Sequence, residues 1–140
     1  MTLSELKSKL RSAGVAGAGG AGFPAYAKLS DAADTIILNC AECEPLLKLH
    51  RQVLAEYAFE ILSALQIVKE ATGAKEVIIA LKKTYKDAIN AVNSVLNKFN
   101  NFSISYLPEV YPAGDEVVTI YESTGRIVPP GKLPISVGVT

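Results

Sequence analysis

The hydrophobic residues of this chain fall into short continuous runs and into longer stretches in which they recur every three or four positions. The runs at Thr35–Leu38, Val77–Leu81 and Phe102–Leu107 predict three buried strands. The stretches between them, about 49–72 and 84–99, have the spacing of core-facing helices. Strands that alternate with helices of these lengths predict an α/β fold, a three-layer Rossmann-like domain with a mainly parallel sheet.

Polar residues and glycines mark where the earlier helices begin and end. Thr2 and Glu5 form a capping-box pattern, which predicts a short amphipathic helix that stops at Gly14. The apolar positions of 49–72 keep a helical spacing throughout, and Gly73 supplies the left-handed residue that closes a helix. We therefore expect one long helix over 49–72.

The second half of the chain carries similar signals. Thr84 and Asp87 predict the N-terminal cap of the next helix. A further helix is expected over 115–123, ended by Gly125. The chain closes on the strand-like run 137–140, which we expect to lack a partner strand, and such an unsupported strand favours a domain truncated at its C-terminus.

Composition narrows the classes of function. With 140 residues, 49% of them hydrophobic, the chain has the size of one domain. Lys and Arg number 14, as do Asp and Glu, so no net field attracts nucleic acid. No apolar run approaches the roughly 20 residues that cross a bilayer, which argues against direct membrane insertion. The N-terminus lacks a secretory signal, so we expect a cytoplasmic protein, at most peripheral to a membrane complex.

A glycine-dense loop follows the first helix. Its segment 17–22 has the pattern Gly-x-Gly-x-x-Gly, which matches a dinucleotide fingerprint, although that fingerprint follows a strand and this one follows a helix. Two interpretations stay open, a tightly packed loop and a nest of backbone amides that holds phosphate. Lys28 would complete the neutralisation of a phosphate, and Phe23 would either stack on a flat ring or pack in the fold.

Two acidic loops follow the first and third strands, at Asn39–Pro45 and Tyr111–Glu116. Ligands of open parallel sheets bind beyond the carboxyl ends of the strands, so these loops should meet at one edge. Their carboxylates repel phosphate and would instead accept hydrogen bonds from sugar hydroxyls, or form a solvated acidic rim. The side chains concerned are Glu42, Glu44, Asp115 and Glu116.

Few residues offer other chemistry. His50 is the only histidine, so a hydrolytic triad or a histidine metal site has little support, and a surface position at a helix start is expected. Cys40 and Cys43 form a Cys-x-x-Cys pattern, which fits a redox disulfide, half of a metal site, or small residues packed at a strand end. Because there is no third cysteine, we assign no metal ligand.

Taken in order, these motifs resemble one family. It is the family of the C subunit of the Rnf electron-transport complex, which includes the cobalamin reductase of propanediol utilisation and, more distantly, the FMN- and NADH-binding flavoprotein subunit of respiratory complex I. The matching segments are 17–24, Lys28-Leu29, Asn39–Leu47, Tyr111–Glu116 and 124–129.

The resemblance implies an electron-transfer flavoprotein. In such a protein non-covalent FMN takes a hydride from NADH and passes electrons singly to 4Fe-4S clusters, so the chemistry belongs to the flavin and no catalytic side chain is assigned. Partners would be FMN, NADH and other subunits of a redox complex. The cofactor-binding residues that the resemblance implies are Gly17, Gly19, Gly20, Gly22, Phe23, Lys28, Asn39, Glu42, Glu44, Gly114, Asp115 and Glu116.

The chain also departs from the family pattern. Ala18 and Ala41 stand where complex I-type proteins usually have Arg and Asp, which removes polar contacts to the nucleotide. Related proteins continue through further domains that carry the iron–sulfur clusters. Residues 1–140 are therefore interpreted as the FMN/NADH-binding core of a longer NADH-dependent oxidoreductase, inactive alone. The alternative is a non-catalytic nucleotide-binding or subunit-docking module of a redox complex.

Overall fold

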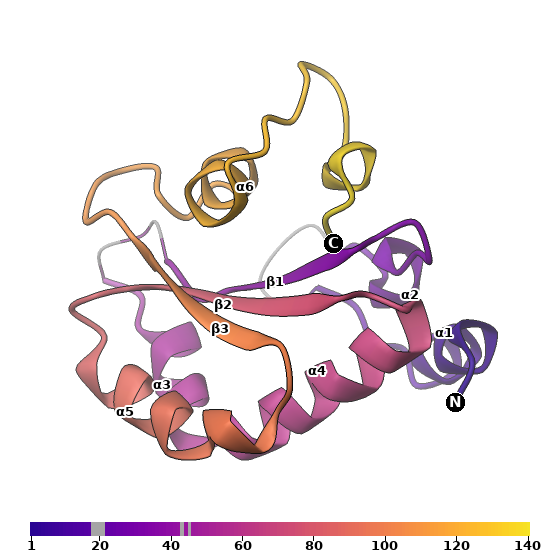
Figure 1. The fold of residues 1–140 in the computed structure, drawn as a ribbon, viewed down its shortest axis with the longest axis horizontal. Helices are drawn as coiled ribbons and strands as arrows, with labels where there is room; N and C mark the ends of the chain where they lie inside the picture. The colour runs from indigo at the N-terminus through magenta and orange to yellow at the C-terminus, as the bar shows by residue number, and fades with distance from the viewer. Residues whose placement is uncertain (18–21, 43, 45) are drawn as a thin grey trace.

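The computed structural model describes residues 1–17, 22–42, 44 and 46–140. Its elements follow one another along the chain as Figure 1 shows. They are α1 (Leu3–Ser12), α2 (Ala25–Lys28), β1 (Thr35–Asn39), α3 (Leu49–Glu56), α4 (Ala58–Thr72), β2 (Glu76–Lys82), α5 (Lys86–Val95), the 3₁₀ helix η1 (Leu96–Lys98), β3 (Phe102–Leu107), α6 (Glu116–Thr124) and the 3₁₀ helix η2 (Pro134–Val137).

The three strands form one parallel sheet in the order β1-β2-β3. Ile37 of β1 lies opposite Ile78 of β2, and Ile79 of β2 lies opposite Ile104 of β3. Helices α3, α4 and α5 cover one face of the sheet, while α6 and η2 lie over the other (Figure 1). The predicted α/β fold with a parallel sheet and helices on both faces is confirmed.

The core is divided by the sheet into a large and a small part. Alternate residues of β2 point to opposite faces, as the pleat of a strand requires. Val77, Ile79 and Leu81 join the large cluster under α3, α4 and α5, together with Leu62 of α4. On the other face Ala80 joins a small cluster, and a further small cluster lies beneath α6.

The segment 49–72 is two helices instead of the single one that its periodicity predicts. The break falls at Tyr57, whose φ of −121° and ψ of 33° leave the helical region. Tyr57 is neither glycine nor proline, so the sequence gives no signal of the bend. The bend keeps Leu54 of α3 and Leu62 of α4 in the same buried cluster, although the two helices have different directions.

The predicted cap of α5 is wrong. Helix α5 begins at Lys86, and the residue before it, Tyr85, makes no side-chain cap. The Thr84 hydroxyl instead donates to Glu109 Oε1 at 2.9 Å and so ties the loop after β2 to the loop after β3. The Thr84 side chain therefore bonds a residue distant in the chain instead of capping α5.

Other helix ends agree with the sequence. The capping box of Thr2 and Glu5 is present at α1. Asp115 Oδ1 accepts from the amide of Val117 at 3.0 Å and so caps α6, which Gly125 ends with a φ of 73°. Gly73 ends α4 with a φ of 76°.

The C-terminal run is not the unsupported strand that we expected. It lies along the outer edge of β1, where Ile37 N donates to Thr140 O at 2.9 Å and Thr140 N donates to Thr35 O at 3.1 Å. Val139 forms a parallel bridge with Thr35 and is buried. Backbone pairing with β1 therefore fixes residues 138–140 in the fold.

The longest α-helix in the described ranges, α4, has 15 residues. Across those ranges we find no helix whose length and apolar character would let it cross a membrane. The same residues contain no group of three or more His, Cys, Asp or Glu side chains placed to hold a metal ion.

Candidate functional site

The loops after β1 and β3 meet at the carboxyl edge of the sheet, as predicted. Asn39 joins them, because its Nδ2 donates to Gly114 O at 2.8 Å. Its Oδ1 accepts from the Ala41 amide at 3.1 Å, which fixes the turn that leaves the strand. These contacts use one donor and one lone pair of the Asn39 amide, and the group has one more of each to offer a ligand.

Glu42 is the most unusual side chain of these loops, because it is a buried carboxylate with 8% of its surface exposed. Its Oε1 accepts from the His50 amide in the first turn of α3 at 3.1 Å, and its own carbonyl accepts from Lys82 Nζ at 3.2 Å. Oε2 has no hydrogen-bond partner among the described residues. Because an unpaired buried oxygen is costly, this atom favours a ligand that donates a hydrogen bond.

A crevice of about 290 Å³ opens beside Glu42. Its lining comes from the loops after all three strands, which places it where parallel sheets bind ligands. The lining residues are Glu42, Glu44, Leu47, Arg51, Lys82, Thr84, Tyr85, Glu109, Val110 and Tyr111. Of the four predicted carboxylates, the crevice includes Glu42 and Glu44 but neither Asp115 nor Glu116.

Asp115 and Glu116 belong instead to the start of α6. Asp115 is the N-cap of that helix, and Glu116 is its first residue. The structure thus gives Asp115 a structural role as a cap, and its Oδ1 is engaged with the amides of Val117 and Val118. Gly114, just before it, is half-buried and offers the carbonyl that Asn39 binds.

The glycine loop is closed at its two ends. Gly17 N donates to Phe23 O at 3.0 Å, and Ala16 forms an antiparallel bridge with Pro24. Gly22 has a φ of 69°, a backbone conformation that favours glycine over any other residue. Two of the predicted ligand residues, Gly19 and Gly20, lie outside the described residues.

Phe23 and Lys28 lie together beyond this loop. Phe23 is 51% exposed, and the Lys28 ammonium lies 5.7 Å from the centre of its ring. Because both side chains reach solvent, they are accessible to a ligand. Lys28 is also tied to the C-terminal run, since its carbonyl accepts from Thr140 Oγ1 at 2.9 Å.

Cys40 is a free and buried thiol at the end of β1. Burial, with a smaller effect from Glu42, raises its pKa to about 12. The interpretation of this cysteine as a packed residue is confirmed. Cys43 lies outside the described residues, so whether the two cysteines pair under oxidising conditions stays a prediction.

His50 lies in the first turn of α3 and has an exposed side chain, as expected. Its Nδ1 is 4.0 Å from Glu42 Oε1. Residue spacing predicts neither this contact nor the positions of Lys82, Arg51 and Tyr85 in the crevice lining. The rule about carboxyl ends, applied to the second strand as well as to the first and third, would have found Lys82 and Tyr85.

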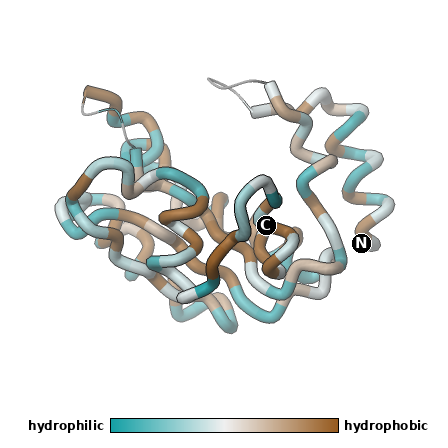
Figure 2. The backbone as a smooth tube through the Cα atoms, turned by 90° about the horizontal axis from the view of Figure 1, so that it is seen from above, coloured by the Kyte–Doolittle hydropathy of each residue, from teal (hydrophilic) through white to brown (hydrophobic). Residues whose placement is uncertain are grey.

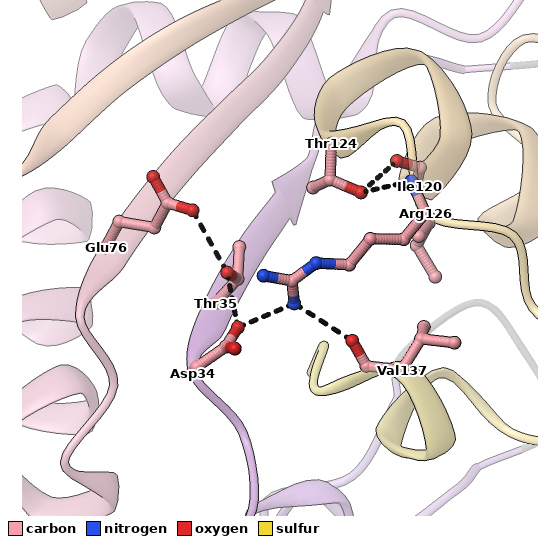
Figure 3. A network of polar contacts seen from close by, with 7 residues as sticks. All are labelled: Asp34, Thr35, Glu76, Ile120, Thr124, Arg126 and Val137. Atoms are coloured by element: carbon pink, nitrogen blue, oxygen red, sulfur yellow. Dashed lines mark hydrogen bonds and ion pairs between the residues drawn. The ribbon is translucent and has the colours of Figure 1, made fainter.

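A polar network at the opposite end of β1 is shown in Figure 3. Arg126 Nη1 donates to Asp34 Oδ1 at 2.6 Å and to Val137 O at 2.9 Å. The Thr35 hydroxyl lies 2.8 Å from Asp34 Oδ1 and 3.1 Å from Glu76 Oε1. This network connects the segment after α6 to the sheet, and it lies away from the crevice because Asp34 precedes β1.

Comparison with known proteins gives three kinds of match. A family described as Nuo51 FMN-binding domain matches residues 10–140. The chain is 51% identical over 134 residues to cobalamin reductase PduS of Citrobacter freundii, covering 96% of this chain and 29% of that protein. It is 35% identical over 142 residues to the C subunit of the ion-translocating oxidoreductase complex from Haemophilus influenzae, covering 99% of this chain and 17% of that protein.

Among solved structures, the fold resembles a chain of the NAD⁺-reducing [NiFe]-hydrogenase in the air-oxidized state. The TM-score is 0.78 at 21% identity, over 96% of this chain and 26% of that chain. The chain thus spans less than a third of the length of these relatives.

Proposed function

This chain belongs to the Nuo51 FMN-binding domain family, and from that premise we propose that it binds FMN within a larger electron-transfer flavoprotein. The resemblance to the C subunit of the Rnf complex and to cobalamin reductase is confirmed. The observation that best supports the proposal is the carboxyl edge of the sheet. There Asn39 joins the loops after β1 and β3, and Glu42, which lines the crevice, keeps a buried oxygen without a partner among the described residues.

The residues present fit a flavin nucleotide. An FMN has a phosphate, a polyol chain and a ring with polar edges, so it needs cationic or amide donors at one end and mixed donors and acceptors at the other. Lys28, whose side chain is exposed, would supply the first set together with the backbone of the glycine loop, part of which lies outside the described residues. Asn39 would contribute to the second set through the unused part of its amide.

We assign the ligand residues accordingly. Gly17, Gly19, Gly20 and Gly22 would present backbone to the flavin, and Lys28 would neutralise its phosphate. Phe23 would stack on a ring of the bound nucleotides. Gly114, Asp115 and Glu116 would border the site from the α6 side, with Asp115 acting mainly by fixing the start of that helix.

NADH is the proposed electron donor. Glu42 and Glu44 would accept hydrogen bonds from sugar hydroxyls, a role that suits carboxylates and keeps phosphate at a distance. Bound FMN would supply the hydride acceptor and release electrons singly. The iron–sulfur clusters that take these electrons, and the subunits that hold them, would lie outside these 140 residues.

Flavin fluorescence tests the FMN site. Residues 1–140 alone should bind FMN weakly or not at all, so the titration uses the full-length protein. FMN should lose emission on binding to the wild type, and Lys28→Ala should weaken binding about tenfold because a charge-assisted contact to phosphate is lost. Lys132→Ala, which removes an equally exposed lysine elsewhere, is the matched control. Equal titration curves for the Lys28→Ala and Lys132→Ala proteins would contradict the assignment of Lys28.

Anaerobic reduction tests the role of Glu42. Addition of NADH to the FMN-loaded full-length protein should bleach the visible flavin band, and Glu42→Gln should raise the half-saturating NADH concentration about tenfold, because the neutral amide accepts more weakly. The exposed Glu122→Gln on α6 is the control. FMN binding without any NADH-driven bleaching would favour the alternative, a nucleotide-binding or docking module without catalysis.

A further inference from the structure

A second cavity, of about 260 Å³, lies between α3 and the N-terminal turn of α5. Three cationic side chains line it, those of Lys48, Arg51 and Lys86, against a single carboxylate, that of Asp87. The chain as a whole has no net charge. This cavity therefore concentrates positive charge that the composition does not reveal.

The cations of this pocket are not neutralised within the described part of the chain. None of the three forms an ion pair within 4.0 Å there, where the ion pairs are those of His50 with Glu42 and of Arg126 with Asp34. Arg51 is held in another way, since its guanidinium carbon lies 4.9 Å from the centre of the buried Tyr85 ring. Stacking of this kind fixes the position of a guanidinium and leaves its N–H groups available.

Two of these cations occupy places that helix electrostatics disfavours. Lys48 is the N-cap residue of α3 and Lys86 is the first residue of α5, at the positive ends of both helices. Neither N-cap residue, Lys48 nor Tyr85, uses its side chain to cap its helix. The positive lysine side chains and the positive N-terminal ends of the two helices repel each other, which destabilises the fold. An anion bound between them would be attracted by both.

We propose that this cavity binds the phosphate or diphosphate group of a small ligand. The cavity of about 260 Å³ has room for a phosphate or diphosphate group. The Arg51 fork matches two phosphate oxygens, and the lysines act as flanking point charges. Asp87 and Ala88, in the first turn of α5, line the same space.

This site is separate from the glycine loop and does not require flavin. It shares Arg51, Thr84 and Tyr85 with the crevice beside Glu42, so the two cavities adjoin. The phosphate would come either from a free anion or from the far end of a nucleotide that extends from the crevice. Both sources require the same three cations.

A pyrophosphate titration followed by amide NMR tests the proposal. Saturable shifts are expected at Arg51, Asp87 and Ala88. Lys48→Ala and Lys86→Ala should each weaken binding about threefold to tenfold, because each removes one charge-assisted contact. Asp87→Asn should strengthen it, since it removes the one carboxylate of the lining.

Lys83→Ala is the matched control, because Lys83 is an exposed lysine near Lys86 that lines neither cavity. Thermal melts should show that all variants stay folded. Equal affinity of the Lys48→Ala, Lys86→Ala and Lys83→Ala proteins would overturn the proposal, as would identical shifts caused by sodium chloride at the same ionic strength.

Two further arms identify the source of the phosphate. If ADP shifts the same amides and binds more tightly than pyrophosphate, the natural ligand is the phosphate of a nucleotide. If pyrophosphate binds as tightly as ADP, the natural ligand is a free anion. Each result supports the site. Absence of shifts at Arg51, Asp87 and Ala88 with every phosphate ligand would remove it, whatever the outcome of the flavin titrations.

Discussion

At the scale of single residues, Cys40 shows how its surroundings set the chemistry of a thiol. The first cysteine of a Cys-x-x-Cys pattern is reactive where its pKa is low, and here burial raises the pKa of Cys40 to about 12. The thiolate is the reacting species, so Cys40 is poorly suited to rapid disulfide exchange in the folded protein.

We therefore expect native Cys40 to resist alkylation. At pH 8 a thiol with a pKa of about 12 has about one part in ten thousand as thiolate, and iodoacetamide should label it at least a hundredfold more slowly than in urea. Mass spectrometry of a Cys43→Ser protein isolates the signal of Cys40. Labelling at the rate of the unfolded chain would show that the site opens readily.

Part of the candidate site was predictable at this scale, and the reason is topological. Asn39 and Glu42 follow a predicted strand, so the rule for parallel sheets placed them at the ligand edge. The cap role of Asp115 was not foreseen, although Asp directly before a helix is a common N-cap. Burial of Glu42 and its contact with the His50 amide depend on three-dimensional packing that spacing does not encode.

At the scale of elements, one ion pair connects the segment after α6 to the start of β1. Arg126 bonds both Asp34 and Val137 O, and Gly138 lies so close that an added Cβ would come within 3.1 Å of Arg126 Nη1. Gly138 also has a φ of 78°. Two features of position 138 favour glycine: its positive φ, and the ion pair that a side chain there would contact too closely.

Stability should depend on this pair in a pH-sensitive way. The hydrogen bond from Arg126, followed by that from Thr35, lowers the pKa of Asp34. A lowered folded-state pKa stabilises the fold above the unfolded value, about 3.9, and that contribution is lost as pH falls through the folded-state value. Arg126→Ala should cost about 1 kcal/mol at pH 7, because solvent screens these part-exposed groups.

Thermal or urea unfolding at pH 7 and near pH 3 measures this effect. The difference in free energy of unfolding between wild type and Arg126→Ala should shrink at the lower pH. Asp31→Asn, an exposed position close to Asp34, is the control and should leave the pH profile unchanged. A gap of constant size across this range would mean that Arg126 stabilises the fold through packing and the Val137 bond alone.

The elements themselves were largely predictable, and the failures have clear physical causes. All three strands and the glycine ends of α4 and α6 were anticipated, because burial and left-handed φ angles leave strong marks in sequence. The break at Tyr57 was not anticipated, because Tyr57 is neither glycine nor proline. The lost cap at Thr84 was not anticipated either, because Thr84 bonds Glu109, a residue distant in the chain. The pairing of residues 138–140 with β1 likewise depends on long-range contacts.

At the scale of the whole molecule, the two faces of the sheet differ in how much they bury. The backbone in Figure 2 is coloured by hydropathy, and hydrophobic segments alternate with hydrophilic ones along it. Among the described residues, the cluster under α3, α4 and α5 has fourteen buried members. The two clusters on the other face have four and three. The α6 side should therefore be the less stable layer.

Native-state hydrogen exchange measures that difference. Amides of Ile120 and Val139 should exchange at least tenfold faster than those of Val77 and Ile79 in β2, because local opening of the α6 layer exposes little apolar surface. The amide of Ile67, on the exposed side of α4, serves as an internal reference for the large layer. Equal protection in both layers would indicate a single cooperative unit.

Pairing of residues 138–140 with β1 has a consequence for self-association. A sheet edge with free N–H and C=O groups is a template for another chain, and proteins that leave such edges open aggregate by strand addition. The C-terminal run occupies the β1 edge and leaves β3 as the outer strand at the other side of the sheet, within the part of the chain that the structure describes. Since 102–107 contains no charged residue, that strand lacks a common protection against intermolecular pairing.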